Sequence, residues 1–241
     1  MRKPIIPESL YEYSLIRDPQ FSPDGKTIAF VKMDASDEKN GYCRSIWLAN
    51  AHGRPNVRRF SGTDADYCPR WSPDGSKLAF ISARSGTPQA YVIGLSGGEP
   101  VRITRMVGGV SNLRWSPDGR WLAFNSDATA AERDLEDKGL LYEDRFSGLS
   151  EAWSAKHREQ LRDPREITKL PYRTGTAFYD GRYSHVYIIP AEGGVPKRLS
   201  RGDYNYSAPE WAADSRSVYT DTNREQSNGD ENFELFTTIY R

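Results

Sequence analysis

Cysteine, histidine and long apolar runs are scarce in this sequence. Its 241 residues include two cysteines and three histidines. Cys43 and Cys68 lack the Cys-x-x-Cys spacing of a zinc or redox site, so we expect two small apolar side chains, no disulfide framework and no metal site. No apolar stretch approaches the roughly 18 residues that a membrane-spanning helix requires. These shortages argue against disulfide-stapled, metal-centred and membrane-spanning proteins.

An excess of charge of one sign is also missing. The 33 basic and 33 acidic side chains cancel to a formal net charge of zero. The composition therefore gives no support for binding to nucleic acid or to an anionic membrane surface. The first residues are basic but lack the apolar core of a secretory signal. We expect a cytoplasmic protein that uses no cofactor.

The most frequent feature is a ten-residue pattern, Trp/Phe-Ser-Pro-Asp-Gly followed by a short apolar stretch. Complete copies begin at Phe21, Trp71 and Trp115, and a copy with Ala-Ala-Asp-Ser instead of Ser-Pro-Asp-Gly begins at Trp211. Proline presets φ at the second position of a type I turn, and glycine adopts the left-handed conformation that follows. Apolar residues alternate on both sides, so each copy predicts two strands joined by a tight turn.

A second hairpin pattern follows three of the copies. It consists of a strand rich in Val, Ile and Tyr, a turn, and a short strand that ends in Arg-x-apolar-Ser/Thr, at residues 46–61, 91–104 and 186–200. Two hairpins make four antiparallel strands in about 40 to 50 residues, which is the size of one β-propeller blade. The predicted fold is all-β, a partial propeller of about four four-stranded blades with a short helical insertion in the third.

The spacing of the copies predicts where the blades begin and end. Within the insertion, residues 150–162 place Trp153, His157 and Leu161 on one helical face, whereas the charge run at 132–138 reads as a solvated surface. The last blade stops after its third strand, which is typical of the front part of a larger protein. The predicted units are a lead-in at 1–18, blades at 19–64, 65–106 and 107–202, the insertion at 128–165 within the third blade, and an incomplete blade at 203–241.

Several residues invite a catalytic or ligand-binding interpretation that the repeats do not favour. Residues 94–98 match Gly-x-Ser-x-Gly, but they align with the glycine turns of the other blades and not with a strand-to-helix nucleophile elbow. The histidines, His52, His157 and His185, share no repeat position, so we predict surface or capping roles and no catalytic residue. The repeated tryptophans are expected to pack between blades and not to form an aromatic ligand cage.

Several stretches, some of which include the repeats, carry a family resemblance. They make the sequence resemble the N-terminal propeller of the prolyl oligopeptidase (S9) clan of serine peptidases, closest to the acylaminoacyl-peptidase group, and they are residues 6–11, 17–25, 69–75, 167–173, 180–187 and 193–194. The Trp-Ser-Pro-Asp-Gly repeats also resemble TolB-type and WD40-like propellers. In the peptidase clan, the propeller caps a C-terminal α/β-hydrolase domain that carries the catalytic Ser, Asp and His, and none of that domain occurs in this sequence.

The resemblance implies that the propeller gates access of short peptides to the hydrolase domain, its partner, while this chain alone catalyses nothing. Tyr172 and Arg173 are the candidate substrate-binding residues, because they lie where the resemblance is most specific and an arginine can hold a peptide carboxylate. A structural ion pair is the other interpretation of Arg173. Two alternatives stay open for the protein: a TolB- or WD40-like interaction scaffold, and a homo-oligomer that pairs half rings through their edges.

Overall fold

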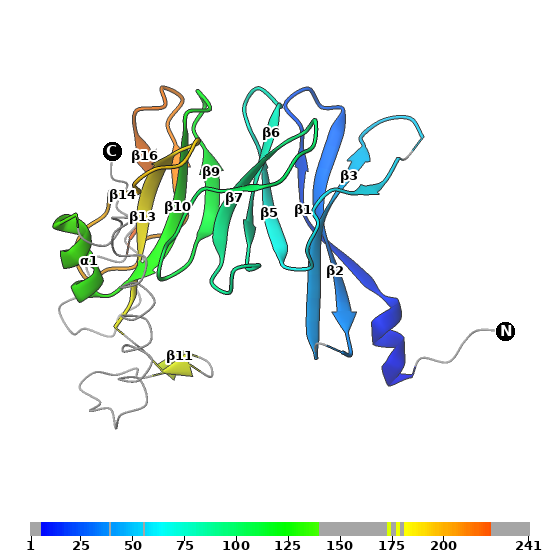
Figure 1. The fold of residues 1–241 in the computed structure, drawn as a ribbon, viewed down its shortest axis with the longest axis horizontal. Coiled ribbons are helices and arrows are strands. Elements are labelled where there is room, and N and C mark those ends of the chain that lie inside the picture. The colour runs from blue at the N-terminus through cyan, green and yellow to red at the C-terminus, as the bar shows by residue number, and fades with distance from the viewer. Residues whose placement is uncertain are drawn as a thin grey trace.

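The computed structural model describes residues 6–38, 40–54, 56–139 and 181–222, together with the backbone of 173–174 and 177–178. Within these residues the chain forms three four-stranded sheets, two two-stranded pairs and two short helices. All strand pairs within the sheets are antiparallel. The all-β prediction is confirmed. Figure 1 shows the four-stranded sheets side by side in sequence order, as blades of a propeller would stand, without closing into a ring.

The first two sheets are built from consecutive strands, as tight turns require. A 3₁₀ helix, η1 (Pro7–Glu12), precedes the first strand, which begins at Ser14 inside the predicted lead-in. The first sheet has the order β1 (Ser14–Phe21), β2 (Thr27–Ser36), β3 (Gly41–Asn50) and β4 (Arg58–Arg59). The second sheet has the order β5 (Asp66–Trp71), β6 (Lys77–Ser82), β7 (Gln89–Gly94) and β8 (Val101–Arg102).

The third sheet joins strands that are distant in sequence. Ala128 at the end of β10 pairs with Tyr183 at the start of β13, 55 positions later (183 − 128). The helix α1 (Ala130–Asp137) follows β10 directly. The sheet contains β9 (Ser111–Trp115), β10 (Trp121–Ala128), β13 (Tyr183–Pro190) and β14 (Lys197–Arg198), and the two pairs are β11 (Arg173–Thr174) with β12 (Ala177–Phe178) and β15 (Glu210–Trp211) with β16 (Val218–Tyr219).

The Ser-Pro-Asp-Gly turns close their hairpins through side-chain hydrogen bonds. The Ser72 hydroxyl donates to Asp74 at 2.6 Å and accepts the Lys77 N–H at 2.9 Å. Hydrogen bonds from the Ser72 and Ser76 hydroxyls lower the pKa of Asp74 to about 2. Gly75 has a φ of +72°, as the turn requires. The Ser-to-Asp bond recurs in the other complete copies, which confirms the predicted hairpins.

The fourth copy keeps its turn although its sequence has changed. Ser215 takes the position of the glycine with a φ of +58°, and the Ala212 N–H donates to the Ser217 carbonyl at 2.8 Å. The Ser215 hydroxyl also accepts the Asp118 N–H of the third copy at 3.0 Å. The fourth turn thus keeps the backbone hydrogen bond that closes it, whereas Ala212 cannot make the hydroxyl bonds that the serine makes in the complete copies.

Tryptophan joins each sheet to the one before it. Trp71 donates its indole N–H to the Gln20 carbonyl at 3.0 Å, and Trp115 donates to the Arg70 carbonyl at 3.0 Å. Trp71 and Trp115 each pack against one of the two apolar clusters, and Trp211 repeats the hydrogen bond more weakly, at 3.4 Å to Arg114. The predicted packing role is confirmed. Phe21 has no indole, and its residue is 64% exposed.

The apolar clusters lie between neighbouring sheets. One contains Ala29 and Ile46 of the first sheet together with Leu78 and Phe80 of the second, and the other joins the second and third sheets. Neither described helix is long and apolar enough to cross a membrane. Through these apolar clusters the sheets pack directly against one another, and neither cluster includes a residue of α1.

Candidate functional site

The helix α1 begins with a reciprocal cap and a buried acid. The Thr129 hydroxyl accepts the Glu132 N–H at 3.2 Å, while the Glu132 carboxylate accepts the Thr129 N–H at 2.7 Å, which is a capping box. Glu132 is only 1% exposed, and Arg182 donates to its other carboxylate oxygen at 2.7 Å. The prediction of a solvated face at 132–138 is wrong for this residue, because one side of α1 faces the third sheet.

The end of α1 is held by Arg198 of the edge strand β14. Its guanidinium donates to Glu136 at 3.0 Å and to Asp137 at 2.7 Å. The Tyr187 hydroxyl donates to both Glu136 oxygens at 3.0 Å. Burial, and then the negative charge of Glu136, raise the pKa of Tyr187. Burial alone would lower the pKa of Arg198, but the hydrogen bond to Glu136 and the charge of Asp137 raise it.

The middle of α1 contacts the only described histidine that is buried. Arg133 Nη1 lies 3.1 Å from His185 Nε2, and His185 Nδ1 lies 2.9 Å from the Ser200 hydroxyl oxygen. A guanidinium can only donate, so Nε2 accepts, and a neutral ring carries its proton on Nδ1 and donates it to Ser200. Arg133 also forms an ion pair with Asp203 through its other terminal nitrogen. His185 is 0% exposed, so the predicted surface or capping role is wrong for it.

The contact between Ser200 and His185 does not form a catalytic pair. A general base needs a free imidazole nitrogen facing the nucleophile, with a carboxylate behind the ring. Here the nitrogen that faces Ser200 is the protonated one, and an arginine lies behind the ring. Ser200 also accepts the Val186 N–H at 2.9 Å. The geometry therefore does not match a catalytic Ser–His pair, and the cluster connects α1 to the third sheet.

The same edge of the other two sheets shows what is specific to the third. In each sheet a Ser or Thr hydroxyl accepts a backbone N–H of the third strand, and an arginine two residues before it donates to its carbonyl; these pairs are Arg59 with Ser61, Arg102 with Thr104, and Arg198 with Ser200. The arrangement explains the repeated Arg-x-apolar-Ser/Thr pattern. Of these three arginines, only Arg198 also donates to carboxylates of a helix. The helix α1 is therefore added to an arginine–hydroxyl arrangement that all three sheets share.

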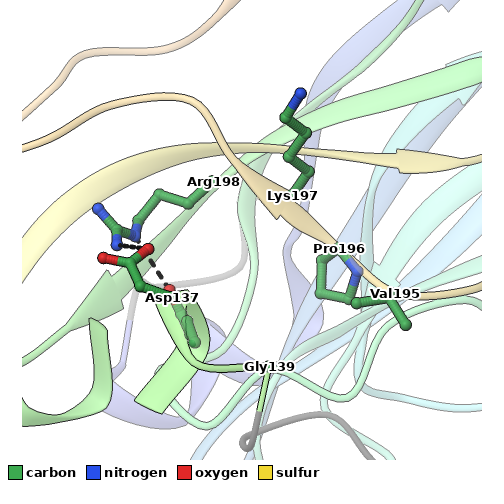
Figure 2. Close-up of a pocket in the computed structure, with 7 residues that line it drawn as sticks. Asp137, Gly139, Val195, Pro196, Lys197 and Arg198 are labelled. Carbon is green, nitrogen blue, oxygen red and sulfur yellow. Dashed lines mark hydrogen bonds and ion pairs between the residues drawn. The ribbon is translucent and has the colours of Figure 1, made fainter. Parts of the chain in front are cut away.

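A groove of about 460 Å³ runs between α1 and β14. Figure 2 shows the Asp137 carboxylate turned toward the Arg198 guanidinium, while the Lys197 side chain extends away from both. Val195 and Pro196 form the apolar part of the groove, and Gly139 and Glu136 complete its lining. The groove thus combines an exposed carboxylate with a small apolar surface, and its wall on one side is the helix.

The structure describes only part of the site predicted from the sequence. Arg173 lies in β11, where its backbone pairs with Phe178, and Tyr172 lies outside the described residues. The predicted helix at 150–162, with His157, is outside them as well. The Gly-x-Ser-x-Gly stretch is a turn, with the Gly97 N–H donating to the Gly94 carbonyl at 3.2 Å, as predicted.

Sequence reasoning missed the polar cluster around α1. The spacing of Thr129 and Glu132 is that of a capping box and was the available signal for a helix start. No pattern linked Arg133 to His185, because these residues are 52 positions apart. Similarly, Glu136 and Arg198 are 62 positions apart.

Comparison with known proteins places these features in a family. The profile described as PD40, TolB beta propeller domain, matches residues 9–133, just over half of the chain. The protein described as "Uncharacterized peptidase YuxL" of Bacillus subtilis is 28% identical over 218 residues, which cover 90% of this chain and 31% of that protein. TolB of Hahella chejuensis is 35% identical over 81 residues, which cover 34% of this chain and 18% of that protein.

Among solved structures, an acylaminoacyl peptidase of Pyrococcus horikoshii superposes with a TM-score of 0.60 and 19% sequence identity. The match covers 88% of this chain and 28% of that one, and at this identity it shows the fold alone. The chain therefore spans about a third of the length of the peptidase relatives that it matches. With its repeated hairpins, its stack of four-stranded sheets and the matching profile, the chain belongs to the TolB β-propeller domain family.

Proposed function

We propose that this chain is the propeller region of a serine peptidase of the acylaminoacyl-peptidase type, and that it gates access to an α/β-hydrolase domain. One observation supports this most: the alignment with the Bacillus peptidase runs through 90% of this chain but only 31% of that protein. The remaining part of such a protein is long enough for a catalytic domain. The peptidase relatives and the fold of the Pyrococcus acylaminoacyl peptidase agree with this assignment.

In this proposal the three sheets and the incomplete blade predicted at 203–241, which includes the β15–β16 pair, make about four blades, with α1 in the third. The blades form a wall stiffened by the tryptophan links between neighbouring sheets. Short or N-blocked peptides pass this wall, while folded proteins are excluded by size. Tyr172 and Arg173 would hold a peptide carboxylate or carbonyl, a role that suits the planar guanidinium. The protein would act in the cytoplasm.

The experiment that tests this proposal uses the whole reading frame that contains this chain. We expect the full polypeptide to hydrolyse acyl-aminoacyl p-nitroanilides and to leave an intact folded protein uncleaved, with loss of kcat/KM on substitution of its nucleophilic serine. The 241-residue chain alone should show no turnover. Turnover by the short chain that disappears in Ser96→Ala would contradict the proposal, because Ser96 lies in a hairpin turn.

The TolB-type scaffold is the second candidate function, favoured by the profile that matches residues 9–133. In that case the reading frame would encode further blades and no hydrolase, and the full polypeptide would be inert toward every p-nitroanilide. The two candidate functions also differ in the length of peptide that the protein should accept. Only a gating propeller predicts that weaker contacts between the blades let longer peptides reach the hydrolase domain. Trp115→Phe, which removes one link between sheets, is the variant for that measurement.

A further inference from the structure

One position has a different residue in each of the three sheets. In each sheet, one backbone N–H of the third strand donates to the Ser or Thr hydroxyl described above. The residue directly before the one that carries this N–H is Ser45 in the first sheet, Gln89 in the second and His185 in the third. The bonds of Gln89 involve no ionisable partner: its carbonyl oxygen accepts from the Thr104 hydroxyl and from the Met106 N–H, and its amide nitrogen donates to the Met106 carbonyl. The third sheet thus has a titratable ring where its neighbour has an amide.

The surroundings of His185 are strongly cationic on the side of α1. Arg133 of α1 contacts Nε2 at 3.1 Å, and Arg198 of β14 acts on the ring through its charge. Asp203, in the loop after β14, is the one acid that opposes them. The remaining neighbours, the Ser200 hydroxyl and the Tyr206 ring, are neutral. Protonation would therefore place two cations in contact inside a water-excluded site.

Protonation also removes a hydrogen bond. Nε2 of the neutral ring accepts from Arg133, whereas an imidazolium has donors on both nitrogens and can accept from neither side. Arg133 would keep its bonds to Asp203, in the loop after β14, and to the Ala128 carbonyl, at the end of β10 just before α1. The contact that joins the middle of α1 to β13 is the one that is lost.

We propose that the contact between His185 and Arg133 is an acid-released latch, and that protonation of His185 undocks α1 from the third sheet while the sheets stay folded. The sheets keep their strand pairing and their two apolar clusters, neither of which includes a residue of α1. The groove between α1 and β14 disappears on release because α1 is one of its walls. Any ligand of that groove is then bound only while the latch is closed.

The direction of the effect follows from proton linkage. Burial, then the charges of Arg133 and Arg198, lower the pKa of His185 from 6.5 to about 4 when α1 is docked. The released state binds the proton more readily, so docking is fully stable above pH 6.5 and weakens as the pH falls toward 4. If the released ring returns to its ordinary pKa, the opening equilibrium of α1 rises roughly 20-fold between pH 7 and pH 5.

Hydrogen exchange measured by mass spectrometry at pH 7 and pH 5, corrected for the intrinsic rates, tests the latch. We expect peptides that cover residues 129–139 to lose protection by roughly 20-fold at pH 5, while peptides from β6 and β7 do not change. His185→Gln, which places in the third sheet the residue that the second sheet uses, should abolish this pH response. The control His52→Gln alters an exposed turn and should leave the response intact.

An equal loss of protection in wild type and His185→Gln would overturn the latch, and so would an α1 that is unprotected at pH 7. If His185→Gln fails to fold, the wild-type chain still decides the question. With only three histidines, each imidazole can be followed by NMR in labelled protein. A His185 signal that titrates near 6.5 while α1 stays docked contradicts the proposal, and a midpoint below 5 supports it.

Discussion

The second and third sheets are built on the same arrangement but are completed in different ways. Both pair a stacked aromatic couple across their central strands, Phe80 with Tyr91 and Phe124 with Tyr187. In the second sheet the polar position beside this couple is filled by Gln89, which bonds to its own loop. In the third it is filled by His185, which bonds to a helix. A repeat can therefore gain a new element through a few polar substitutions at one edge.

The second and third sheets also differ in the elements that their ion pairs connect. Arg84, just after β6 in the second sheet, donates from Nη2 to both carboxylate oxygens of the buried Asp66 at 3.0 Å, and this pair lies within the sheet and its own loop. Three ion pairs of the third sheet instead connect it to α1, through Glu132, Glu136 and Asp137. We therefore expect substitutions in the third sheet to affect the helix, and those in the second to affect the sheet itself.

The largest expected effect is that of Arg198→Ala compared with Arg102→Ala. The side chains of Arg198 and Glu136 are 8% and 6% exposed, so removing the arginine leaves a buried carboxylate without its cation. Breaking such a pair costs about 3–5 kcal/mol. Arg102 is exposed and should cost less than about 1 kcal/mol. Urea unfolding of both variants measures the difference, and equal losses would mean that α1 contributes nothing to the third sheet.

A smaller effect is expected for Gln89→Leu. The variant leaves the Met106 N–H and carbonyl without their side-chain partner in a buried site, which costs about 1–3 kcal/mol. Because no ionisable group is involved, the loss in unfolding free energy should be the same at pH 7 and pH 5. A loss that grows with acidity would show that the second sheet is as charge-dependent as the third.

The smallest effect is expected where the two sheets meet. Trp115→Phe replaces the indole with a smaller aromatic ring and removes the N–H that reaches the Arg70 carbonyl at 3.0 Å, and one neutral hydrogen bond contributes about 0.5–1.5 kcal/mol. Trp71→Phe, at the junction with the first sheet, is the matched variant and should lose a similar amount. Thermal unfolding of the two proteins compares the junctions, and an unchanged midpoint in both would leave the indole N–H without a structural role.

The repeated hairpins could be predicted from the sequence because the residues that determine them lie close together in the chain. The turn residues Ser72, Pro73, Asp74 and Gly75 fix a hairpin within a few positions, and the aromatic residue before them marks the junction between sheets. Such signals act over a short distance along the chain, and each copy repeats them. The hairpins and the packing of the tryptophans could therefore be predicted.

The polar cluster could not be predicted because its determinants are distant. Arg133 gives no sign in its own neighbourhood that it will meet His185, and the charged residues around it have the pattern of an exposed surface. The helix start was readable from Thr129 and Glu132, but the side that it buries depends on Arg182 and Arg198, 50 and 62 residues away from their acids. Tyr172 and Arg173 stay predictions.

The tryptophan links also determine how the molecule should come apart. Each indole reaches only the sheet immediately before its own, so mechanical and thermal strain passes from one neighbour to the next and not across the whole stack. Stability in such an array is close to a sum over sheets and their junctions. Within the residues that the structure describes, the first sheet, whose Phe21 makes no such bond and is largely exposed, packs against one neighbouring sheet, the second. Under force we expect it to detach first, as a unit, and to leave the second and third sheets bound to each other.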